Sequence, residues 1–335
     1  MAIRPLLLSA VVATLVATTA ATLPAGAAAP AGAPAYAVRA ERMVASAAAR
    51  AGQRLVMVGE RGHIMLSDDE GKTWRTAQTP LENDLTAVFF LDAKRGWAVG
   101  HRGAALFSED GGATWQQAKV ELPENNALMD VMFFDAEHGI AVGAFGVVAE
   151  SGDGGKSWSS RPAIAASPAG EFDAHLYGIA RNADGQLYIA GESGTLLRSG
   201  DGGKRWSKLN SPYAGSYFGI VALPQRRLLA YGMRGNVFLS TDGGERWQKQ
   251  DIGDTVTVQG ALHGKDGLLV LVGNDGMVFA SADAGSSFRP HKQSDRRAIN
   301  SALFAADGGL LLFGEAGYSR AALPAIKPST VAARP

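Results

Sequence analysis

A four-residue motif, Gly-x-x-Gly, recurs along this chain at nearly constant spacing. Its seven copies begin at Gly59, Gly100, Gly143, Gly191, Gly232, Gly273 and Gly314. The steps between them are 41, 43, 48, 41, 41 and 41 residues, a period that suits a four-stranded propeller blade and exceeds that of most solenoid repeats. The sequence therefore predicts an all-β fold, a seven-bladed β-propeller of four-stranded antiparallel blades.

A second motif, Ser-x-Asp-x-Gly-x-x-Trp, begins eight residues after the first glycine in six of the seven repeats, with Phe288 replacing the last tryptophan. We call it the Asp box. A short carboxylate can accept backbone N–H groups while glycine adopts a left-handed conformation, so each box is predicted to join the third and fourth strands of a blade. With one aspartate per blade, we expect a structural role rather than calcium binding or catalysis. The box aspartates are Asp69, Asp110, Asp153, Asp201, Asp242 and Asp283.

The innermost strand of each blade is predicted to open on an apolar residue fifteen positions before the first glycine. These residues are Val44, Leu85, Leu128, Leu176, Tyr217, Val258 and Ile299. Two positions later the side chains are small in six blades: Ser46, Ala87, Gly178, Gly219, Gly260 and Ser301. Strands that crowd around one axis need small side chains, and Asp130 is the exception.

The seventh repeat has no Asp box and no clear fourth strand after Gly317. The segment from Tyr36 to Arg39 lies just before the first inner strand and has no other predicted place. We therefore predict that it supplies the missing outer strand and closes the ring, which would cover two strand edges.

The start of the chain is typical of a secretory signal peptide, with Arg4, an apolar run from Leu6 to Ala21 and the small residues Ala25-Gly26-Ala27. A retained membrane anchor is the alternative. Without cysteine, the chain can form no disulfide and carry no thiolate metal site or lipoprotein anchor. After cleavage we expect a monomer in the periplasm or outside the cell, without direct membrane insertion. The predicted parts are a signal peptide (1–27), a linker (28–35), the propeller (36–323) and a tail (324–335).

Lysine and arginine total 32, as do aspartate and glutamate, so no long-range field favours nucleic acid. The histidines lack ligand spacing, and we predict no metal, no cofactor and no catalytic residue. The alternative is a glycosidase of the sialidase or xyloglucanase type. It would need two convergent carboxylates, or a tyrosine nucleophile with three arginines, and neither set can be assigned.

The connections between an outer strand and the next inner strand carry all the length variation of the repeat. From box aromatic to inner-strand opener they measure 11, 13, 18, 11, 11 and 11 residues. Variable loops on a rigid scaffold often carry function, and these share a face with the Gly-x-x-Gly hairpins. We expect a protein partner to bind this face. Arg61, Arg102 and Arg234 occupy one hairpin position, where they could grip a carboxylate or phosphate or simply be solvated. The other candidates are Phe145, Glu171, Asp173, His175, Tyr213 and Tyr217.

The Asp box resembles the bacterial neuraminidase repeat of sialidases, xyloglucan-cleaving glycosidases and sorting receptors. Whole-blade phrases, such as residues 128–143 followed by Gly146 and residues 151–158, are similar to the photosystem II stability and assembly factor family, over about residues 36 to 323. This resemblance implies an extracytoplasmic, non-catalytic propeller that escorts or stabilises a membrane protein during assembly. Photosystem II, and with it photosynthesis, is one candidate context; an envelope transporter is another.

Overall fold

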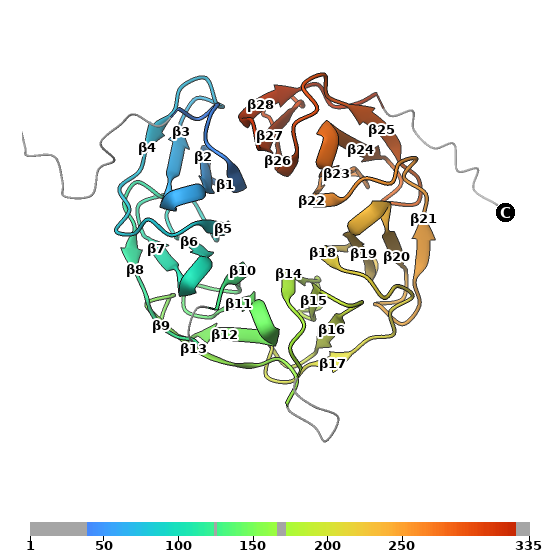
Figure 1. Cartoon of the computed structure of the whole chain (residues 1–335), viewed down its shortest axis with the longest axis horizontal. Coiled ribbons are helices and arrows are strands. Elements are labelled where there is room, and N and C mark those ends of the chain that lie inside the picture. The colour runs from blue at the N-terminus through green and yellow to red at the C-terminus, as the bar shows by residue number, and fades with distance from the viewer. Residues whose placement is uncertain (1–38, 124–125, 166–171, 326–335) are drawn as a thin grey trace, which may run out of the picture. The chain divides into compact units, whose positions relative to one another are not determined.

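The described part of the chain forms seven sheets around a central axis, antiparallel apart from one added strand in the third (Figure 1). The computed structural model describes residues 39–123, 126–165 and 172–325. The predicted seven-bladed β-propeller is therefore confirmed. No helix in these ranges is long and apolar enough to cross a bilayer. The predicted signal peptide, linker and most of the tail lie outside the described residues.

The strands follow the predicted order within each blade, from the axis to the rim. Blades one and two contain β1 (Ala45–Ala51), β2 (Arg54–Gly59), β3 (Ile64–Ser67) and β4 (Arg75–Thr76), then β5 (Leu85–Phe90), β6 (Gly96–Gly100), β7 (Ala105–Ser108) and β8 (Gln116–Gln117). Blade three contains β10 (Leu128–Phe133), β11 (Gly139–Gly143), β12 (Val147–Ser151) and β13 (Ser157–Pro162). Blade four contains β14 (Leu176–Arg181), β15 (Leu187–Gly191), β16 (Leu196–Ser199) and β17 (Ser207–Lys208). Blade five contains β18 (Tyr217–Leu223), β19 (Arg227–Gly232), β20 (Val237–Ser240) and β21 (Gln248–Gln250). Blade six contains β22 (Val258–His263), β23 (Leu269–Gly273), β24 (Met277–Ser281) and β25 (Arg289–Lys292). Blade seven contains β26 (Ile299–Phe304), β27 (Leu310–Gly314) and β28 (Gly317–Ala321).

The second strand of each blade is apolar except at its ends, because both of its faces pack on neighbouring blades. All of β23 is buried. Successive side chains of a strand point to opposite faces, so Leu269 and Leu271 join the cluster shared with blade five, while Val270 and Val272 join the one shared with blade seven. Burial of this continuous apolar surface is the main force that holds adjacent blades together.

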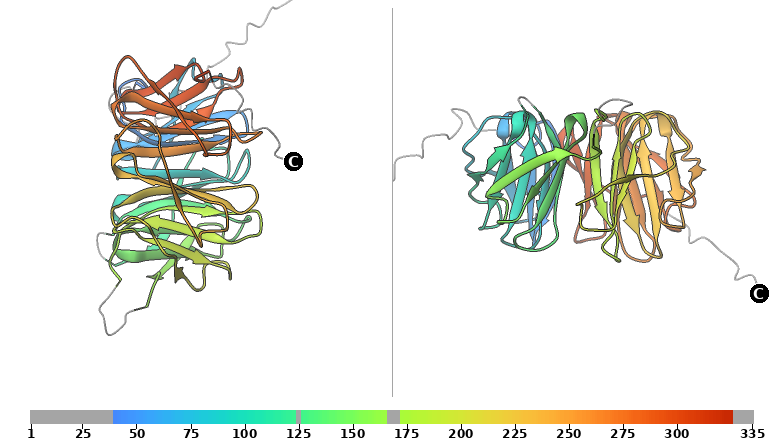
Figure 2. Two further views of the ribbon diagram at one scale, coloured as in Figure 1. Left: turned by 90° about the vertical axis from the view of Figure 1, so that its right-hand side faces the viewer. Right: turned by 90° about the horizontal axis from the view of Figure 1, so that it is seen from below.

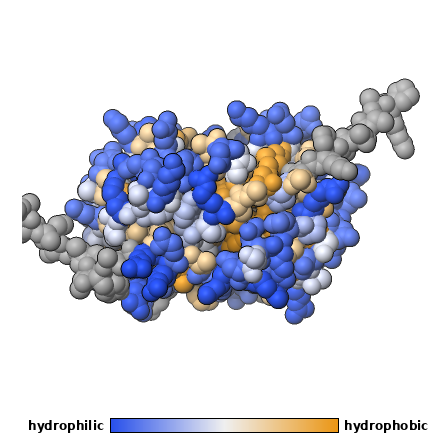
Figure 3. Space-filling view, turned by 90° about the horizontal axis from the view of Figure 1, so that it is seen from above, coloured by the Kyte–Doolittle hydropathy of each residue, from blue (hydrophilic) through white to orange (hydrophobic). Residues whose placement is uncertain are grey.

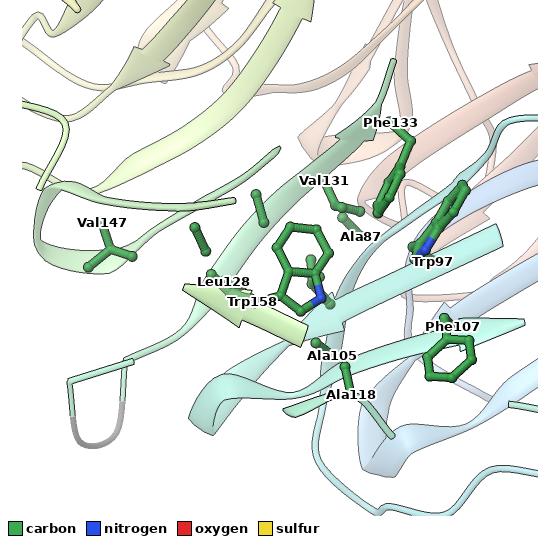
Figure 4. Packing of buried hydrophobic residues seen from close by; sticks show 13 residues of the cluster. Ala87, Trp97, Ala105, Phe107, Ala118, Leu128, Val131, Phe133, Val147 and Trp158 are labelled. Atoms are coloured by element: carbon green, nitrogen blue, oxygen red, sulfur yellow. The ribbon is translucent and has the colours of Figure 1, made fainter. Parts of the chain in front are cut away.

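The Asp box forms the predicted turn. In the third box the Ser151 hydroxyl donates to Asp153 Oδ1 at 3.0 Å and accepts the Gly155 N–H at 2.9 Å. Asp153 also accepts the N–H and the hydroxyl of Ser157, at 2.9 and 2.6 Å. Trp158 is then buried against blade two (Figure 4). The box carboxylates are thus engaged in their own turns, which supports the structural interpretation.

The inner strands show one error in the predicted register. In blades two to seven the predicted opener pairs with the first glycine of the hairpin, as Leu85 does with Gly100. In blade one Ala45, not Val44, pairs with Gly59, and Val44 is 40% exposed. The small residue two positions on is therefore Ala47 rather than Ser46. The reason is a tight two-residue turn between β1 and β2, which makes this blade one residue shorter.

Asp130 bridges two blades beside the axis. Its carboxylate accepts the N–H of Val131 at 2.8 Å and, from the neighbouring inner strand β14, the N–H of Ile179 at 2.9 Å. Burial raises the pKa of Asp130 to about 6, although both N–H donors act in the opposite direction. Its carboxylate also contributes, after burial, to a raised pKa for Tyr231. Asp130, the one large residue among those two positions after the inner-strand openers, therefore links blades three and four.

This pKa predicts a pH-dependent stability. Because the folded state holds the Asp130 proton more tightly than the unfolded chain, the stabilisation is complete below about pH 4 and is lost as the pH rises through about 6. Measured by denaturant unfolding relative to Asp130→Asn, the free energy of unfolding of the wild type is expected to fall by about 2 kcal/mol between pH 4 and pH 8. Subtracting the free energy of unfolding of Asp130→Asn removes the contributions of the other titrating groups. A difference that stays constant or rises with pH would contradict the assignment.

The thirteen-residue connection between blades two and three adds a strand. Within it, β9 (Lys119–Glu121) pairs in parallel with β13 of blade three. The third sheet therefore has five strands, in the order β10-β11-β12-β13-β9. Part of the longer connection therefore serves this lateral contact.

The seventh blade has three strands in the part of the chain that the structure describes. The predicted closing strand, Tyr36 to Arg39, lies outside the described residues except for Arg39, which is not in a strand. The chain that follows does join the last blade to the first. Ala40 and Met43 are buried in a cluster with Phe313, and the Asn300 side chain donates to the Ala45 carbonyl at 2.8 Å.

Candidate functional site

The Gly-x-x-Gly hairpins and the outer-to-inner connections lie on the same face of the ring, as predicted. The residue after the first glycine donates its N–H to a carbonyl of the connection: His101 to Asp84 at 2.9 Å, Glu192 to His175 at 2.8 Å. We call this side the hairpin face. The Asp boxes lie at the opposite ends of the strands, on what we call the Asp-box face. There the Gly154 N–H donates to the carbonyl of Glu137, in the turn between β10 and β11. Figure 2 shows the two faces edge-on.

The three candidate arginines occupy equivalent positions at the hairpin tips. Arg61, Arg102 and Arg234 have φ values of 52°, 56° and 55°. Non-glycine residues adopt this left-handed conformation infrequently, and here it turns the side chain outward, so that all three are exposed. The glycine that follows is required, because a Cβ on Gly62 would lie 2.3 Å from the Leu81 carbonyl oxygen. The hairpin geometry thus presents whatever side chain precedes the second glycine.

The hairpin tips differ in whether the protein neutralises them. Asp275, the tip of blade six, is paired with Arg296 at 2.7 Å and with Lys292, and these hydrogen bonds lower its pKa to about 2. By contrast, Arg102 and Arg234 make no ion pair with any described residue. Their guanidinium groups are therefore free to bind an external carboxylate or phosphate.

A hollow beside Arg102 lies between the second hairpin and the connection that leads into blade two. Its volume is about 720 Å³, and its lining residues are Glu82, Asn83, Asp84, His101 and Arg102. Asp84 also accepts the Arg61 N–H at 2.7 Å. The hollow therefore offers carboxylate acceptors from the connection and the Arg102 guanidinium from the hairpin, which suits a polar peptide better than a bare anion.

Aromatic side chains form a row across blades three to five, which we call the aromatic row. Phe145 is 57% exposed, and its N–H donates to His175 Nδ1 at 3.0 Å. The ring centroids of Phe145 and His175 are 4.7 Å apart, those of His175 and Tyr177 6.2 Å, and those of Tyr177 and Phe218 5.3 Å. Phe145 is exposed, and His175, Tyr177 and Phe218 are half-buried beside it. An edge-to-face row with an exposed end suits a protein contact.

Tyr177 and Phe218 were missed at the sequence level, whereas Phe145 and His175 were predicted. Each missed residue directly follows an inner-strand opener, where the pairing register shifts between Leu176 and Gly178 or between Tyr217 and Gly219. A bulge re-aims the side chain that it carries. The signal was present as an aromatic residue at the same repeat position in adjacent blades.

The remaining candidates are distributed differently from the expectation. Asp173 is exposed, and Glu171 lies outside the described residues. Tyr213 is partly buried, with its ring 5.5 Å from that of Tyr217. Tyr217 itself is fully buried, its hydroxyl bonds Ser211 at 3.0 Å, and burial raises its pKa to about 12. Its selection as a surface residue was wrong, because an inner-strand opener packs between blades.

Comparison with known proteins agrees with this architecture. Residues 66–127 and 115–320 match the family described as photosynthesis system II assembly factor YCF48. The chain belongs to this family. The match includes the hairpin tips with Arg102 and Arg234 and the aromatic row, whereas Arg61 lies before it. No curated protein matches the sequence significantly.

Solved structures of YCF48 share the fold. A structure described as YCF48 bound to D1 peptide is 18% identical, with a TM-score of 0.69 over 84% of this chain and 94% of the other. YCF48 from Cyanidioschyzon merolae is 16% identical, with a TM-score of 0.66 over 83% and 94%. The WD40 β-propeller domain of Doa1 is 11% identical and has a TM-score of 0.67 over 83% and 92%. At identities this low, the structural similarity shows that the proteins share the propeller fold.

Among the residues that the structure describes, no group of three or more His, Asp or Glu side chains could hold a metal ion. The box aspartates are held in turns at the far face from the arginines. For Asp69 the hydroxyl and the N–H of Thr73 lower the pKa to about 2, which keeps the carboxylate ionised and bound within its turn. The hairpin face, by contrast, presents the cationic side chains of Arg102 and Arg234 and the exposed ring of Phe145.

Proposed function

We propose that this chain is an exported, monomeric and non-catalytic scaffold whose hairpin face binds an extracytoplasmic segment of a membrane protein during assembly or stabilisation of a complex. The supporting observation is the combination, on one face, of Arg102 and Arg234, which make no ion pair with any described residue, and an aromatic row in which Phe145 is exposed. Aromatic residues and arginine are the side chains most enriched at the energetic centres of protein interfaces.

Family membership supports a peptide as the ligand class. A YCF48 structure is described as bound to D1 peptide, so a D1 peptide is a reasonable first probe for this chain. In our proposal, arginine tips bind carboxylates of the partner and the aromatic row covers an apolar side chain. Export by the N-terminal signal would place the propeller in the periplasm or outside the cell, where such segments are accessible.

Site-specific photo-crosslinking tests the proposed face. We would place benzoylphenylalanine at position 145 of the processed chain, with the same group at Lys204, an exposed residue of the Asp-box face, as the matched control. With the D1 peptide as probe, we expect a crosslinked product from position 145 alone. Crosslinking from position 204 alone, or from neither position while other partners also fail, would overturn the assignment. Turnover of a chromogenic sialoside or β-glucan oligosaccharide by the purified chain would overturn the non-catalytic part.

A further inference from the structure

The tip of the third hairpin is held by a histidine from the connection that leads into blade four. The N–H of Phe145 donates to His175 Nδ1 at 3.0 Å. A backbone N–H can only donate, so this nitrogen must carry its lone pair, and the imidazole is neutral with its proton on Nε2. The two rings also meet edge to face, with centroids 4.7 Å apart. In its neutral form, His175 therefore holds both the backbone and the ring of Phe145.

The first hairpin makes the same contact with a different acceptor. There the Arg61 N–H donates to Asp84 Oδ1 at 2.7 Å. Asp84 and His175 are equivalent, because each directly precedes an inner-strand opener. A carboxylate remains an ionised acceptor above about pH 5, whereas an imidazole ordinarily changes its charge between about pH 5 and 8. The other blades carry Val44, Ala127, Ser216, Thr257 and Ala298 at this position. His175 is thus the member of the series whose side chain titrates near neutral pH.

Phe145 needs this support because of its backbone conformation. Its φ and ψ are 54° and 41°, in the left-handed region that a bulky side chain adopts rarely and at a cost. The residues on either side are anchored independently. The Ala144 N–H and the Gly146 carbonyl each bond a backbone group of another segment, at 2.9 and 2.7 Å. Loss of the His175 contact would therefore free the Phe145 tip without unfolding the blade.

The titratable and charged groups around His175 come from several elements. Glu192, in the hairpin of blade four, accepts the His175 backbone N–H at 3.3 Å, and Asp173 is exposed two residues earlier. Burial raises the pKa of Tyr177 on β14, so its phenol stays neutral. Lys208 of β17 lies 5.0 Å from the ring of a neighbouring phenylalanine, and the hairpin of blade three carries no charged side chain. His175 makes no ion pair with any described residue. The contact with Phe145 is therefore the interaction that protonation of the ring changes most directly.

We propose that His175 is a pH-sensitive latch for the aromatic row. The neutral imidazole accepts the Phe145 N–H and fixes the tip for partner binding. Protonation of Nδ1 removes this acceptor, sets two N–H donors against each other and releases the tip. Binding of an extracytoplasmic segment at the hairpin face then weakens as the pH falls. This last step rests on the proposed function, whereas the state of the tip does not.

Nuclear magnetic resonance tests the latch without a partner. The processed chain would be labelled with ¹⁵N-phenylalanine, and the Phe145 signal assigned through Phe145→Tyr. We expect this signal to shift in the wild type between pH 8 and pH 5. It should stay in place in His175→Asn, because the amide Oδ1 takes the position of Nδ1 and does not titrate.

His138→Asn is the matched control, since it removes an exposed histidine in the turn between β10 and β11. In this variant the Phe145 signal should shift as in the wild type. A wild-type signal that does not move, or an equal shift in His175→Asn, would overturn the latch.

Calorimetric titration with the D1 peptide at pH 7.5 and pH 5.5 tests the consequence for binding. We expect the wild-type affinity to fall about fivefold, the factor that one hydrogen bond supplies, and that of His175→Asn to change by less than about twofold. An unchanged wild-type affinity, or an equal fall in both proteins, would overturn the regulatory role. Absence of binding at both pH values would count against the proposed function alone, because the resonance experiment still decides the state of the tip.

The same comparison distinguishes the hairpin face from another apolar surface. Figure 3 views the rim from the top of Figure 1, where the last and first blades lie, and shows apolar side chains gathered among hydrophilic ones. The aromatic row belongs to blades three to five, on the other side of the ring. A peptide bound at that rim would not sense His175. A pH dependence that His175→Asn abolishes would therefore place the peptide at the aromatic row.

Discussion

Replacement of Trp97 by alanine is expected to lower the free energy of unfolding by about 3–5 kcal/mol, the range typical of buried tryptophan and phenylalanine truncations. Trp97 is 2% exposed. Its ring stacks on Phe133 of the next blade, with centroids 3.5 Å apart and planes 7° from parallel. Its Nε1–H donates to the Gly154 carbonyl in the third Asp box at 2.7 Å. One side chain therefore joins the cores of two blades and a turn (Figure 4).

The loss has two parts that can be separated. Trp97→Phe retains most of the apolar contact but leaves the Gly154 carbonyl without its donor, so it should cost about 1–2 kcal/mol. Denaturant unfolding monitored by circular dichroism measures both variants. Phe145→Ala, an exposed aromatic truncation, serves as the control and should change stability little. A loss below about 1 kcal/mol for Trp97→Ala would mean that the blades do not depend on this contact.

Charge reversal at two hairpin tips should have the largest effect on partner binding. The double variant Arg102→Glu/Arg234→Glu is expected to weaken binding of the D1 peptide at least about 100-fold, because each hydrogen bond to a charged group contributes about 1.5–3 kcal/mol. Both side chains are exposed and have no ion-pair partner among the described residues, so the fold should tolerate the change. Isothermal titration calorimetry at two ionic strengths measures the effect.

A matched control distinguishes a local contact from a change in net charge. Lys94→Glu/Lys204→Glu alters the charge equally at exposed positions of the Asp-box face and should leave the affinity within about twofold at moderate salt, because distant surface charges are screened. The Arg-to-Glu variant should also lose most of the salt dependence of binding. If both double variants weaken binding equally, the arginine tips have no specific role.

Much of the architecture could be predicted because the residues that form the turns and the buried strands recur at fixed positions in each repeat. The predicted inner-strand opener Leu85 is the first residue of β5. Left-handed glycines occur where the two motifs require them, as at Gly62 and Gly155, with φ values of 68° and 82°. Local turn chemistry and burial on both faces act within one repeat and its neighbours, so a repeated spacing predicts blade number, strand order and the position of each hairpin tip.

The site was only partly predictable. The equivalence of Arg61, Arg102 and Arg234 follows from repeat position alone. Whether a tip is available depends on its surroundings: Asp275 is neutralised by Arg296 and Lys292, which follow it by many residues. Tyr217 was selected as exposed and is buried, while Tyr177 and Phe218 were passed over and lie in the aromatic row.

The sequence by itself determined the seven-bladed propeller, the turns that build it and the face on which the hairpins lie, because these depend on contacts within a repeat. Only the tertiary structure decided which side chains on that face are unpaired, that Val44 is displaced by Ala45, and that β9 extends the third sheet. It also showed that, within the described ranges, the last sheet ends at β28, with Ala40 beside Gly317. These features depend on packing between blades, where residues far apart in the sequence compete for the same space.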